Sequence, residues 1–271
     1  MPGPVVFIHV PKTGGSTFLS VLRRNFPASD VLLPDAQKDK NLVEIDQALT
    51  RLSAQHARSI HGHFPLSYRD RLPSNARYAT ILRDPVQRQY SHYQWSYGRK
   101  LAAGKDWPVS KALGKGRLVD NLQTRMLSAL EDPFTRPADD DLLNAALAEL
   151  ERLAFVGLVE RFPESMLLAQ ERLGLRHISY FRRNVRGTPH PPVDVDALRE
   201  HNQLDLQLYE HAVAMLAPDL DRLQPRAASL LRADRTLSTF RPTTDLAALG
   251  YVADYGVSAI GARARRVLQW R

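Results

Sequence analysis

Short apolar segments of strand length alternate with longer segments of helical periodicity along the first 216 residues. The strand-length segments are VVFIHV, ARSIHG, ARYATILR, AFVGLVE and HISYFRR, at positions 5–10, 57–62, 76–83, 154–160 and 177–183. Apolar residues recur at helical spacing over 16–25, 42–54, 85–98, 118–130, 140–152, 163–173 and 195–216. Because strands that alternate with helices are typical of βαβ units, the pattern predicts an α/β fold, a single domain with a central parallel sheet flanked by helices.

The composition fits a globular domain that needs no metal or disulfide to fold. The chain has 271 residues, of which 44% are hydrophobic, and a chain of this size buries roughly 75% of its unfolded surface. It contains no cysteine, which excludes thiolate catalysis, cysteine-bound zinc and disulfides. The N-terminus lacks the basic region of a signal peptide, and no segment approaches the ~20 apolar residues of a membrane-spanning helix. We therefore expect a soluble, cytoplasmic protein.

Most of the excess positive charge lies near the C-terminus. The net charge is +8, and residues 222–271 contribute +6 of it through nine arginines and three aspartates. This change predicts a main domain over 1–221 and a basic C-terminal extension over 222–271. The extension is either a solvated appendage or a surface for acidic glycans, nucleic acid or lipid headgroups. Its segment VSAIGARARRVLQWR has the pattern of a basic amphipathic helix, which indicates weak contact with a membrane surface.

The turn after the first predicted strand, PKTGGST, has the residues of an oxyanion site. In a parallel α/β sheet this turn lies at the edge where ligands bind. The two glycines allow a left-handed backbone and close approach to a ligand, and the N–H groups at the start of the following helix are unpaired donors. The lysine adds a full positive charge, and the hydroxyls add further donors. The candidate residues are Lys12, Thr13, Gly14, Gly15, Ser16 and Thr17.

The order of these residues differs from that of two common nucleotide motifs. The nucleoside-triphosphate loop has the spacing G-x-x-x-x-G-K-[ST], whereas Lys12 precedes Gly14 here. The glycines also lack the G-x-G-x-x-G spacing of a dinucleotide fold. Taken alone, the segment is equally compatible with an ordinary tight turn.

A second anion site is predicted after the third predicted strand, in ILRDPVQRQYSHY. Arg83 stands at the carboxyl end of this strand, Asp84 can cap the following helix, and Pro85 suits its first turn. Ser91 lies about two turns along the helix, so its hydroxyl and the Arg83 guanidinium can converge on one phosphate. The alternative is a surface ion pair between Arg83 and Asp84 beside a core helix.

Two histidines end the second predicted strand, in SIHGHFP. Residues two apart in a strand point to the same face, so His61 and His63 share a site if the chain stays extended through Gly62. A histidine in that position can accept the proton of an acceptor hydroxyl. The alternative is that both side chains only pack or form hydrogen bonds locally.

Together the two anion motifs resemble the sulfotransferases that depend on 3'-phosphoadenosine 5'-phosphosulfate (PAPS), specifically the carbohydrate O-sulfotransferases that include the heparan sulfate 2-O- and 6-O-sulfotransferases. The family turn P-K-T-G-[GT]-[ST]-[ST]-F matches PKTGGSTF at 11–18, and the family segment R-[DN]-P-x-x-R-x-x-S-x-[YF] matches RDPVQRQYSHY at 83–93. Further similarities follow in the family's order at 61–64, 121–127, 155–168 and 201–212.

The resemblance implies a P-loop-type, sulfotransferase-like fold and an enzyme that moves a sulfuryl group, in line, from PAPS to a hydroxyl of a carbohydrate or small glycosylated acceptor, without a metal. An acidic acceptor is compatible with this reading. By similarity, Lys12 and the amides of 14–17 hold the 5'-phosphosulfate, and Arg83 and Ser91 hold the 3'-phosphate. Arg186, in a looser match, is predicted as a further nucleotide contact.

The resemblance also assigns the catalytic groups. The 2-O-sulfotransferases have a similar histidine pair, of which the second is the general base, so we predict His63 as the base and His61 as its helper or replacement. Lys12 is expected to neutralise the leaving phosphate oxygen.

Two other functions remain open. A P-loop kinase that uses Mg-ATP shares the general fold, but it needs Mg²⁺ and usually an acidic ligand at the end of a neighbouring strand, where Arg83 stands instead. A basic, non-enzymatic protein that binds polyanions is suggested by the pI of about 9.9. Its charge lies in the extension, however, and no nucleic-acid-binding motif accompanies it, so no nucleic-acid partner is expected.

The acceptor is not specified by any motif. Arg125, four residues after Asn121 on one helix face, either binds an acidic sugar or holds the sheet edge in place. We expect the determinants of the acceptor in the loops at 27–41, 98–117 and 130–140.

Overall fold

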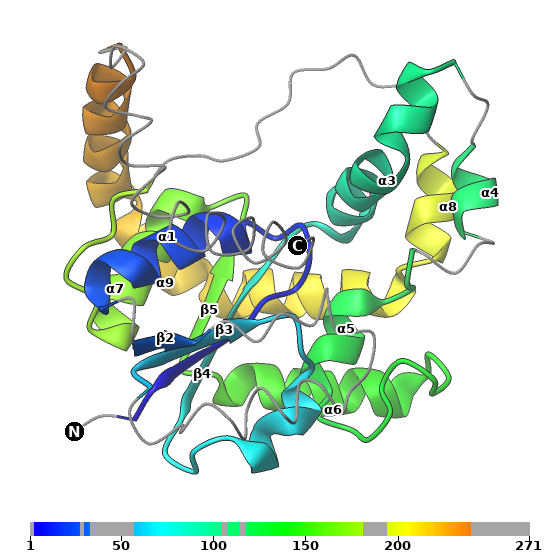
Figure 1. The fold of residues 1–271 in the computed structure, drawn as a ribbon, viewed down its shortest axis with the longest axis horizontal. Helices are drawn as coiled ribbons and strands as arrows, with labels where there is room; N and C mark the ends of the chain where they lie inside the picture. Colours follow the sequence, from blue (N-terminus) through cyan, green and yellow to red (C-terminus); the bar gives the residue numbers. More distant parts are fainter. Residues whose placement is uncertain are drawn as a thin grey trace, which may run out of the picture. The chain divides into compact units, whose positions relative to one another are not determined.

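The central sheet of the protein is parallel throughout. The computed structural model describes residues 3–27, 30–32, 57–104, 108–113, 118–180 and 194–239. In this part of the chain the strands form one five-stranded sheet in the order β2-β3-β1-β4-β5 (Figure 1). They are β1 (Val5–Ile8), β2 (Val31–Leu32), β3 (Ser59–Gly62), β4 (Arg77–Leu82) and β5 (Phe155–Leu158). Every neighbouring pair is parallel, which confirms the predicted α/β fold.

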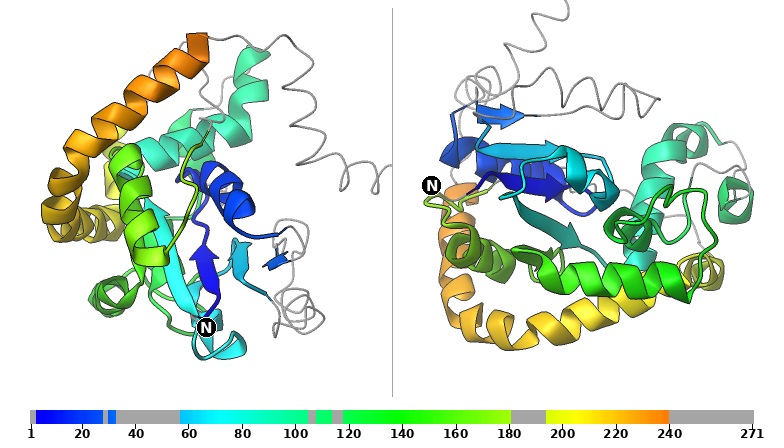
Figure 2. Two further views of the ribbon diagram at one scale, coloured as in Figure 1. Left: turned by 90° about the vertical axis from the view of Figure 1, so that its left-hand side faces the viewer. Right: turned by 90° about the horizontal axis from the view of Figure 1, so that it is seen from below.

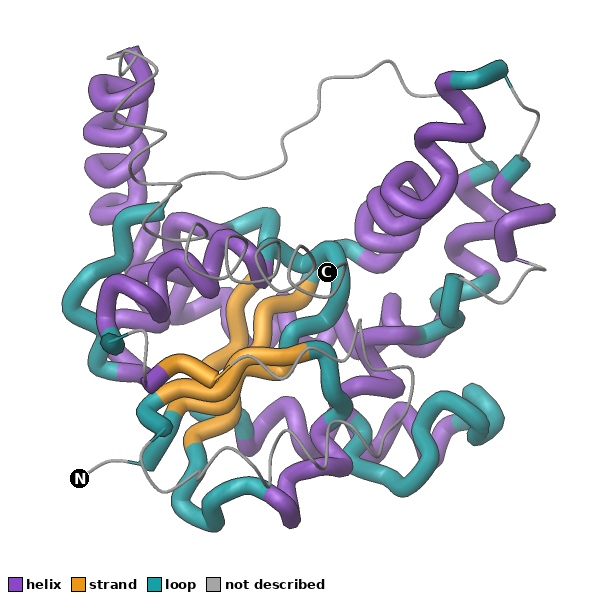
Figure 3. The backbone as a smooth tube through the Cα atoms, viewed as in Figure 1, coloured by secondary structure: helices purple, strands orange, loops and turns teal. Residues whose placement is uncertain are grey.

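Helices cover both faces of this sheet (Figure 3). One face carries α1 (Gly15–Asn25) and α7 (Phe162–Leu173) (Figure 1). The other face carries α6 (Asp140–Arg152), with α5 (Leu122–Leu127) and the 3-10 turn η2 (Leu66–Arg71) beside it. Further helices are α3 (Pro85–Ala102), α4 (Val109–Leu113), α8 (Val195–Glu200) and α9 (Gln203–Thr239).

The packing of β1 fixes the position of the first helix. All four residues of β1 are fully buried, as expected for a parallel strand that is covered on both sides. The Phe7 ring lies 4.6 Å from the Phe18 ring of α1, and Phe18 lies 5.8 Å from the Phe155 ring of β5, measured between ring centroids. These contacts hold α1, and with it the turn that precedes it, on the centre of the sheet.

The strand predicted over 177–183 is wrong where the structure describes it, because residues 177–180 form no strand. Side chains at the end of α1 form hydrogen bonds with the backbone of this segment, in place of the bonds that a neighbouring strand would form. The Asn25 amide donates to the His177 carbonyl oxygen at 2.7 Å, and Arg24 donates to the Ser179 carbonyl oxygen at 2.9 Å. Residues 181–183 lie outside the described residues.

Two predicted helices differ in extent. The helix predicted over 118–130 begins only after Asn121, whose backbone is left-handed with φ 45°. The helix predicted over 195–216 is divided into α8 and α9, and at the break the Asn202 side chain donates to the Leu198 carbonyl oxygen at 2.7 Å. The other predicted helices in the described part of the chain are confirmed.

The helix α9 continues through the predicted boundary between 221 and 222. The chain divides into two compact units, Met1–Pro225 and Arg226–Arg271, and the domain division made from composition stays a prediction. The predicted helix at 42–54 and the basic segment at 257–271 lie outside the described residues. In the part that the structure describes, no helix is both long and apolar enough to cross a lipid bilayer.

Candidate active site

The carboxyl ends of the parallel strands bring most of the predicted site residues to one edge of the sheet. β1 leads into the turn that contains Lys12, β3 leads into His63, and β4 leads into Arg83. The registers of β1 with β3 and with β4 place these three ends side by side (Figure 2). This is the edge of an open α/β sheet where ligands bind.

The turn after β1 is stabilised by a hydrogen bond between its own residues. Lys12 and Gly14 both have a left-handed backbone, with φ of 73° and 79°. The hydroxyl of the fully buried Thr13 donates to the Val10 carbonyl oxygen at 2.8 Å. Thr13 therefore shapes the turn, and its hydroxyl is not directed at a ligand as the sequence suggested.

The start of α1 supplies backbone donors to the same turn. The N–H of Thr17 donates to the Gly14 carbonyl oxygen at 2.9 Å, so the predicted Thr17 amide is engaged within the turn. The N–H groups of Gly15 and Ser16 stand in the first turn of the helix, where no carbonyl of the helix can accept from them. Together with the helix dipole, they make this end of α1 suited to an anion.

The two glycines of the turn serve different purposes. Gly14 has the left-handed backbone that residues with a Cβ rarely adopt. At Gly15, a Cβ would lie 2.0 Å from Cδ2 of His9. Gly15 therefore leaves the space that the buried His9 ring occupies, a role that the sequence did not indicate.

Arg83 joins the two predicted anion sites. Its Nη1 donates to the Lys12 carbonyl oxygen at 3.3 Å. The Gln123 side chain holds its backbone, accepting from the Arg83 N–H at 3.0 Å and donating to its carbonyl oxygen at 2.9 Å. Burial lowers the pKa of the Arg83 guanidinium, and the charge of Glu160 opposes this shift. The buried Nε of Arg83 has no hydrogen-bond partner among the described residues, and its N–H has the chemistry to donate to a phosphate oxygen.

A buried polar network behind Arg83 holds Gln123 in place. Asp205 of α9 accepts from the N–H groups of Gln123 and Thr124 at 3.1 and 2.8 Å. The Nε of the fully buried Arg88 lies 3.9 Å from the same carboxylate. Burial raises the pKa of Asp205, and the charge of Arg88 opposes this shift. Through these contacts, the family-like segments in α5 and α9 support the position of Arg83.

The other residues predicted around the second anion site differ in what the structure shows of them. Asp84 caps α3 as predicted, since its Oδ1 accepts from the Gln87 N–H at 2.8 Å. Ser91 lies on α3 and is partly exposed. Arg186 lies outside the described residues, so its predicted nucleotide contact stays a prediction.

Arg125 has a structural role. Its Nη1 donates to the carbonyl oxygens of Pro133 and Arg136 at 2.6 and 2.8 Å, and its Nη2 pairs with Asp120 at 2.8 Å. The guanidinium is thus directed into the loop that follows α5. Of the two predicted roles, the contact with an acidic sugar is not supported.

His61 and His63 have different surroundings. The His61 ring is buried, stacks on Phe7 with centroids 5.0 Å apart, and places Nε2 3.2 Å from the Gly15 carbonyl oxygen. Burial, followed by the charge of His63, lowers the pKa of His61 to about 3. His61 therefore supports the turn as a neutral donor.

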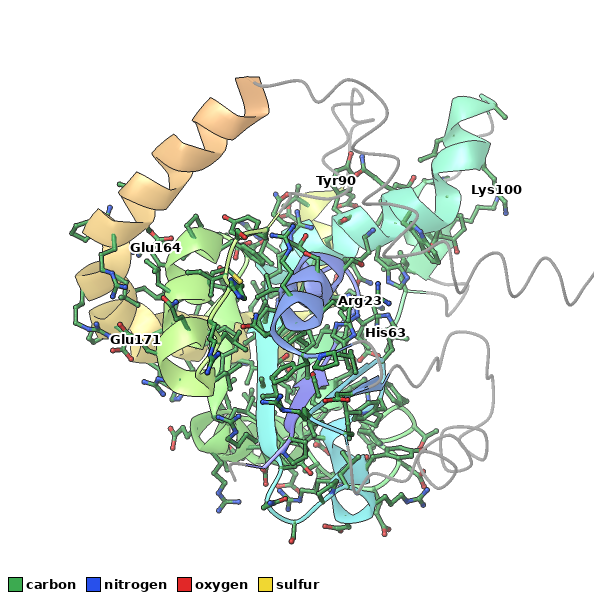
Figure 4. The ribbon with its side chains drawn as sticks, turned by 60° about the vertical axis from the view of Figure 1, so that its left-hand side comes forward. Arg23, His63, Tyr90, Lys100, Glu164 and Glu171 are labelled. Atoms are coloured by element: carbon green, nitrogen blue, oxygen red, sulfur yellow. The ribbon has the colours of Figure 1, made fainter. Side chains whose placement is uncertain are left out.

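His63 is partly exposed at the end of β3, where it is labelled in Figure 4. Its Nδ1 lies 2.7 Å from the His9 carbonyl oxygen. Because a carbonyl oxygen only accepts, Nδ1 donates, and in neutral His63 the lone pair is then on Nε2. This tautomer suits a group that accepts a proton through Nε2.

Two further histidines complete the neighbourhood and were missed from the sequence. The His9 ring lies 4.0 Å from that of His63 and 4.8 Å from that of His61, and burial lowers its pKa well below 6.5. His92 of α3 has its pKa lowered to about 4 by burial and by the charges of Arg88, Lys12 and His63. The only sequence signals for these two were their positions beside the first turn and beside Ser91.

No cluster of acidic groups suited to a metal occurs in the described part of the chain. At the end of β5, Glu160 accepts from the Asp84 N–H at 3.1 Å and from the Tyr209 hydroxyl at 2.7 Å. Its carboxylate thus connects β5 to α3 and α9.

Comparison with known proteins places the chain near one group of enzymes. It matches no protein-family model. It is 28% identical to heparan-sulfate 6-O-sulfotransferase 2 of Danio rerio over 77% of this chain and 57% of that protein. The identity is 26% to heparan-sulfate 6-O-sulfotransferase 3-B of Danio rerio and 27% to heparan-sulfate 6-O-sulfotransferase 1 of Homo sapiens, again over 77% of this chain. The chain spans 57, 62 and 64% of the length of these three relatives. The predicted resemblance to carbohydrate sulfotransferases is confirmed.

Proposed function

We propose that this chain, as a relative of the carbohydrate sulfotransferases, transfers the sulfuryl group of PAPS to a hydroxyl of a carbohydrate. The observation that carries the proposal is the contact of Arg83 with the Lys12 turn. It brings the Arg83 guanidinium to the backbone of the turn that contains Lys12, so the two predicted anion sites adjoin at one edge of the sheet. Two adjoining anion sites suit a donor with phosphate at both its 5' and 3' positions. A nucleoside triphosphate carries no 3'-phosphate for Arg83 to bind.

The residues of this edge have matching chemistry. Lys12 and the N–H groups of Gly15 and Ser16 would hold the 5'-phosphosulfate and neutralise the charge that develops on the leaving phosphate oxygen. The unpartnered Nε–H of Arg83 would donate to a 3'-phosphate oxygen, with the Ser91 hydroxyl as a second donor. PAPS supplies an activated sulfuryl group when it is bound.

His63 is the proposed general base. With Nδ1 donating to the His9 carbonyl oxygen, Nε2 is the atom that takes the proton of the acceptor hydroxyl as its oxygen attacks. His61 is proposed to assist by holding the Gly15 carbonyl, and so the turn, in place. The cytoplasmic location and the role of the basic extension stay predictions.

The test is calorimetric titration with 3'-phosphoadenosine 5'-phosphate, in parallel with 5'-AMP and with Mg-ATP. We expect binding that requires the 3'-phosphate, that needs no Mg²⁺, and that weakens roughly tenfold or more in Arg83→Ala, since a charged hydrogen bond is lost. Arg58→Ala is the matched control, because Arg58 immediately precedes β3 at the opposite edge of the sheet. Preference for Mg-ATP, or equal loss of affinity in both variants, would overturn the proposal.

A further inference from the structure

An exposed tryptophan lies beside the candidate active site. Trp95 on α3 has 61% of its surface exposed. On the same helix, Tyr93 and Tyr97 are buried in a cluster with α4 and α8, so the packing of α3 does not use the indole. The Nζ of Lys12 lies 6.0 Å from the centroid of the Trp95 ring. A single exposed aromatic ring is common on protein surfaces, but this one adjoins the lysine that would contact the reacting group.

His92 belongs to the same neighbourhood. Its ring lies 6.0 Å from the Trp95 ring, at an angle of 40°. The Nδ1 atom of His92 is buried and has no hydrogen-bond partner among the described residues. The charges of Lys12 and His63 both act on His92. Thus Trp95 and His92, which we call the acceptor platform, lie next to the two groups assigned to the transfer step.

We propose that the acceptor platform binds a sugar ring of the acceptor, with a pyranose stacked on the Trp95 indole. The inference rests on the proposed function. For the transfer, the acceptor hydroxyl must lie in line with the sulfuryl group, next to Lys12 and His63. The sugar ring that carries this hydroxyl must then lie close to Lys12, and the Trp95 indole is there.

The chemistry of the indole matches a sugar better than it matches the other candidate ligand. A pyranose presents a face of C–H groups that packs on a flat aromatic ring, while its hydroxyls stay at the edge, and a rigid side chain with two rotatable bonds loses little entropy on binding. The adenine of the donor is the other flat ligand in reach. Adenine stands at the opposite end of the nucleotide from the sulfuryl group, whereas Trp95 adjoins the lysine assigned to the phosphosulfate.

The test compares Trp95→Ala and Trp95→Phe with the control Val213→Ala, which shortens an exposed apolar side chain on α9. Each protein is titrated with 3'-phosphoadenosine 5'-phosphate. It is then assayed with radiolabelled PAPS and a fixed panel: a heparan-sulfate hexasaccharide, nitrophenyl glycosides of glucose, N-acetylglucosamine and glucuronic acid, and 2-naphthol as an acceptor without sugar. KM and kcat are measured for the acceptors that the wild type sulfates.

We expect Trp95→Ala to raise the KM for a carbohydrate roughly tenfold, the effect of one lost stacking contact, with little change in kcat or nucleotide affinity. Trp95→Phe should restore most of the loss, and Val213→Ala should match the wild type. Weaker nucleotide binding in Trp95→Ala would assign the indole to adenine and overturn the inference. An unchanged KM, or transfer to 2-naphthol alone, would also overturn it while the donor assignment stands, whereas failure of the wild type to bind the nucleotide would refute the proposed function itself.

Discussion

Acidification from pH 7 to pH 5 should destabilise the folded protein through its buried histidines. Burial lowers the pKa of His61 from 6.5 to about 3 and that of His92 from 6.5 to about 4. In the unfolded chain both side chains regain ordinary values, so the unfolded state binds more protons once the pH falls below 6.5. The stability that the neutral histidines contribute is therefore fully present above pH 6.5. It is lost as the pH falls toward the pKa values that the two histidines have in the folded protein.

The size of the effect follows from the shifts. At pH 5, each histidine is protonated in the unfolded chain and neutral in the folded one, which costs about 2 kcal/mol per side chain relative to pH 7. His61 and His92 together account for about 4 kcal/mol, a large part of the 5–15 kcal/mol that stabilises an average domain. Asp205 acts in the opposite direction, because burial raises its pKa. A single histidine is therefore best isolated by substitution.

The assay is urea unfolding at a series of pH values between 5 and 7. In His61→Gln, which keeps a side-chain donor for the Gly15 carbonyl, the loss of stability over this range should be about 2 kcal/mol smaller than in the wild type. His211→Gln is the control, because His211 is exposed and pairs with Glu151 on the surface. If the wild type and His61→Gln show the same dependence on pH, the buried, neutral state of His61 is refuted.

Three further predictions concern the site. His63→Ala should leave the affinity for 3'-phosphoadenosine 5'-phosphate nearly unchanged and lower the transfer rate by ~10²- to 10⁴-fold; retained activity would assign the base elsewhere. Gln123→Ala leaves both backbone groups of Arg83 without their hydrogen-bond partner. Urea unfolding should then show a loss of about 2–4 kcal/mol in folding stability, and calorimetry should show weaker nucleotide binding. Unchanged affinity would show that Arg83 does not need Gln123 to hold its position. Gly15→Ala should cost about 1–3 kcal/mol in urea unfolding, because the added Cβ displaces the His9 ring; an unchanged midpoint would contradict the packing described for that ring.

The sequence predicted the parts of the fold that depend on local pattern. Apolar runs bounded by turns identified four of the strands, and the glycines between β1 and α1 identified the turn that joins them. The strand predicted at 177–183 failed because an asparagine more than a hundred residues away satisfies the backbone there. A pattern of apolar residues contains no information about such a partner.

The sequence predicted which residues group at the candidate site, but it did not predict the residues that hold them in position. Residues at the ends of parallel strands must converge, so the grouping of Lys12, His63 and Arg83 followed from the topology. The role of Gln123 and the burial of His9 depend on contacts between elements distant in sequence. Such contacts appear only once the elements are packed.

The most direct test of the account is the transfer reaction itself. The protein is incubated with PAPS labelled in the sulfuryl group and the carbohydrate panel, in the presence of EDTA, and the labelled product and released 3'-phosphoadenosine 5'-phosphate are quantified. The account predicts label on a carbohydrate hydroxyl, an equal amount of released nucleotide, and no requirement for metal. A parallel incubation contains Mg-ATP in place of PAPS and no EDTA. Absence of label on every carbohydrate, with phosphate transfer in the parallel incubation, would contradict the account.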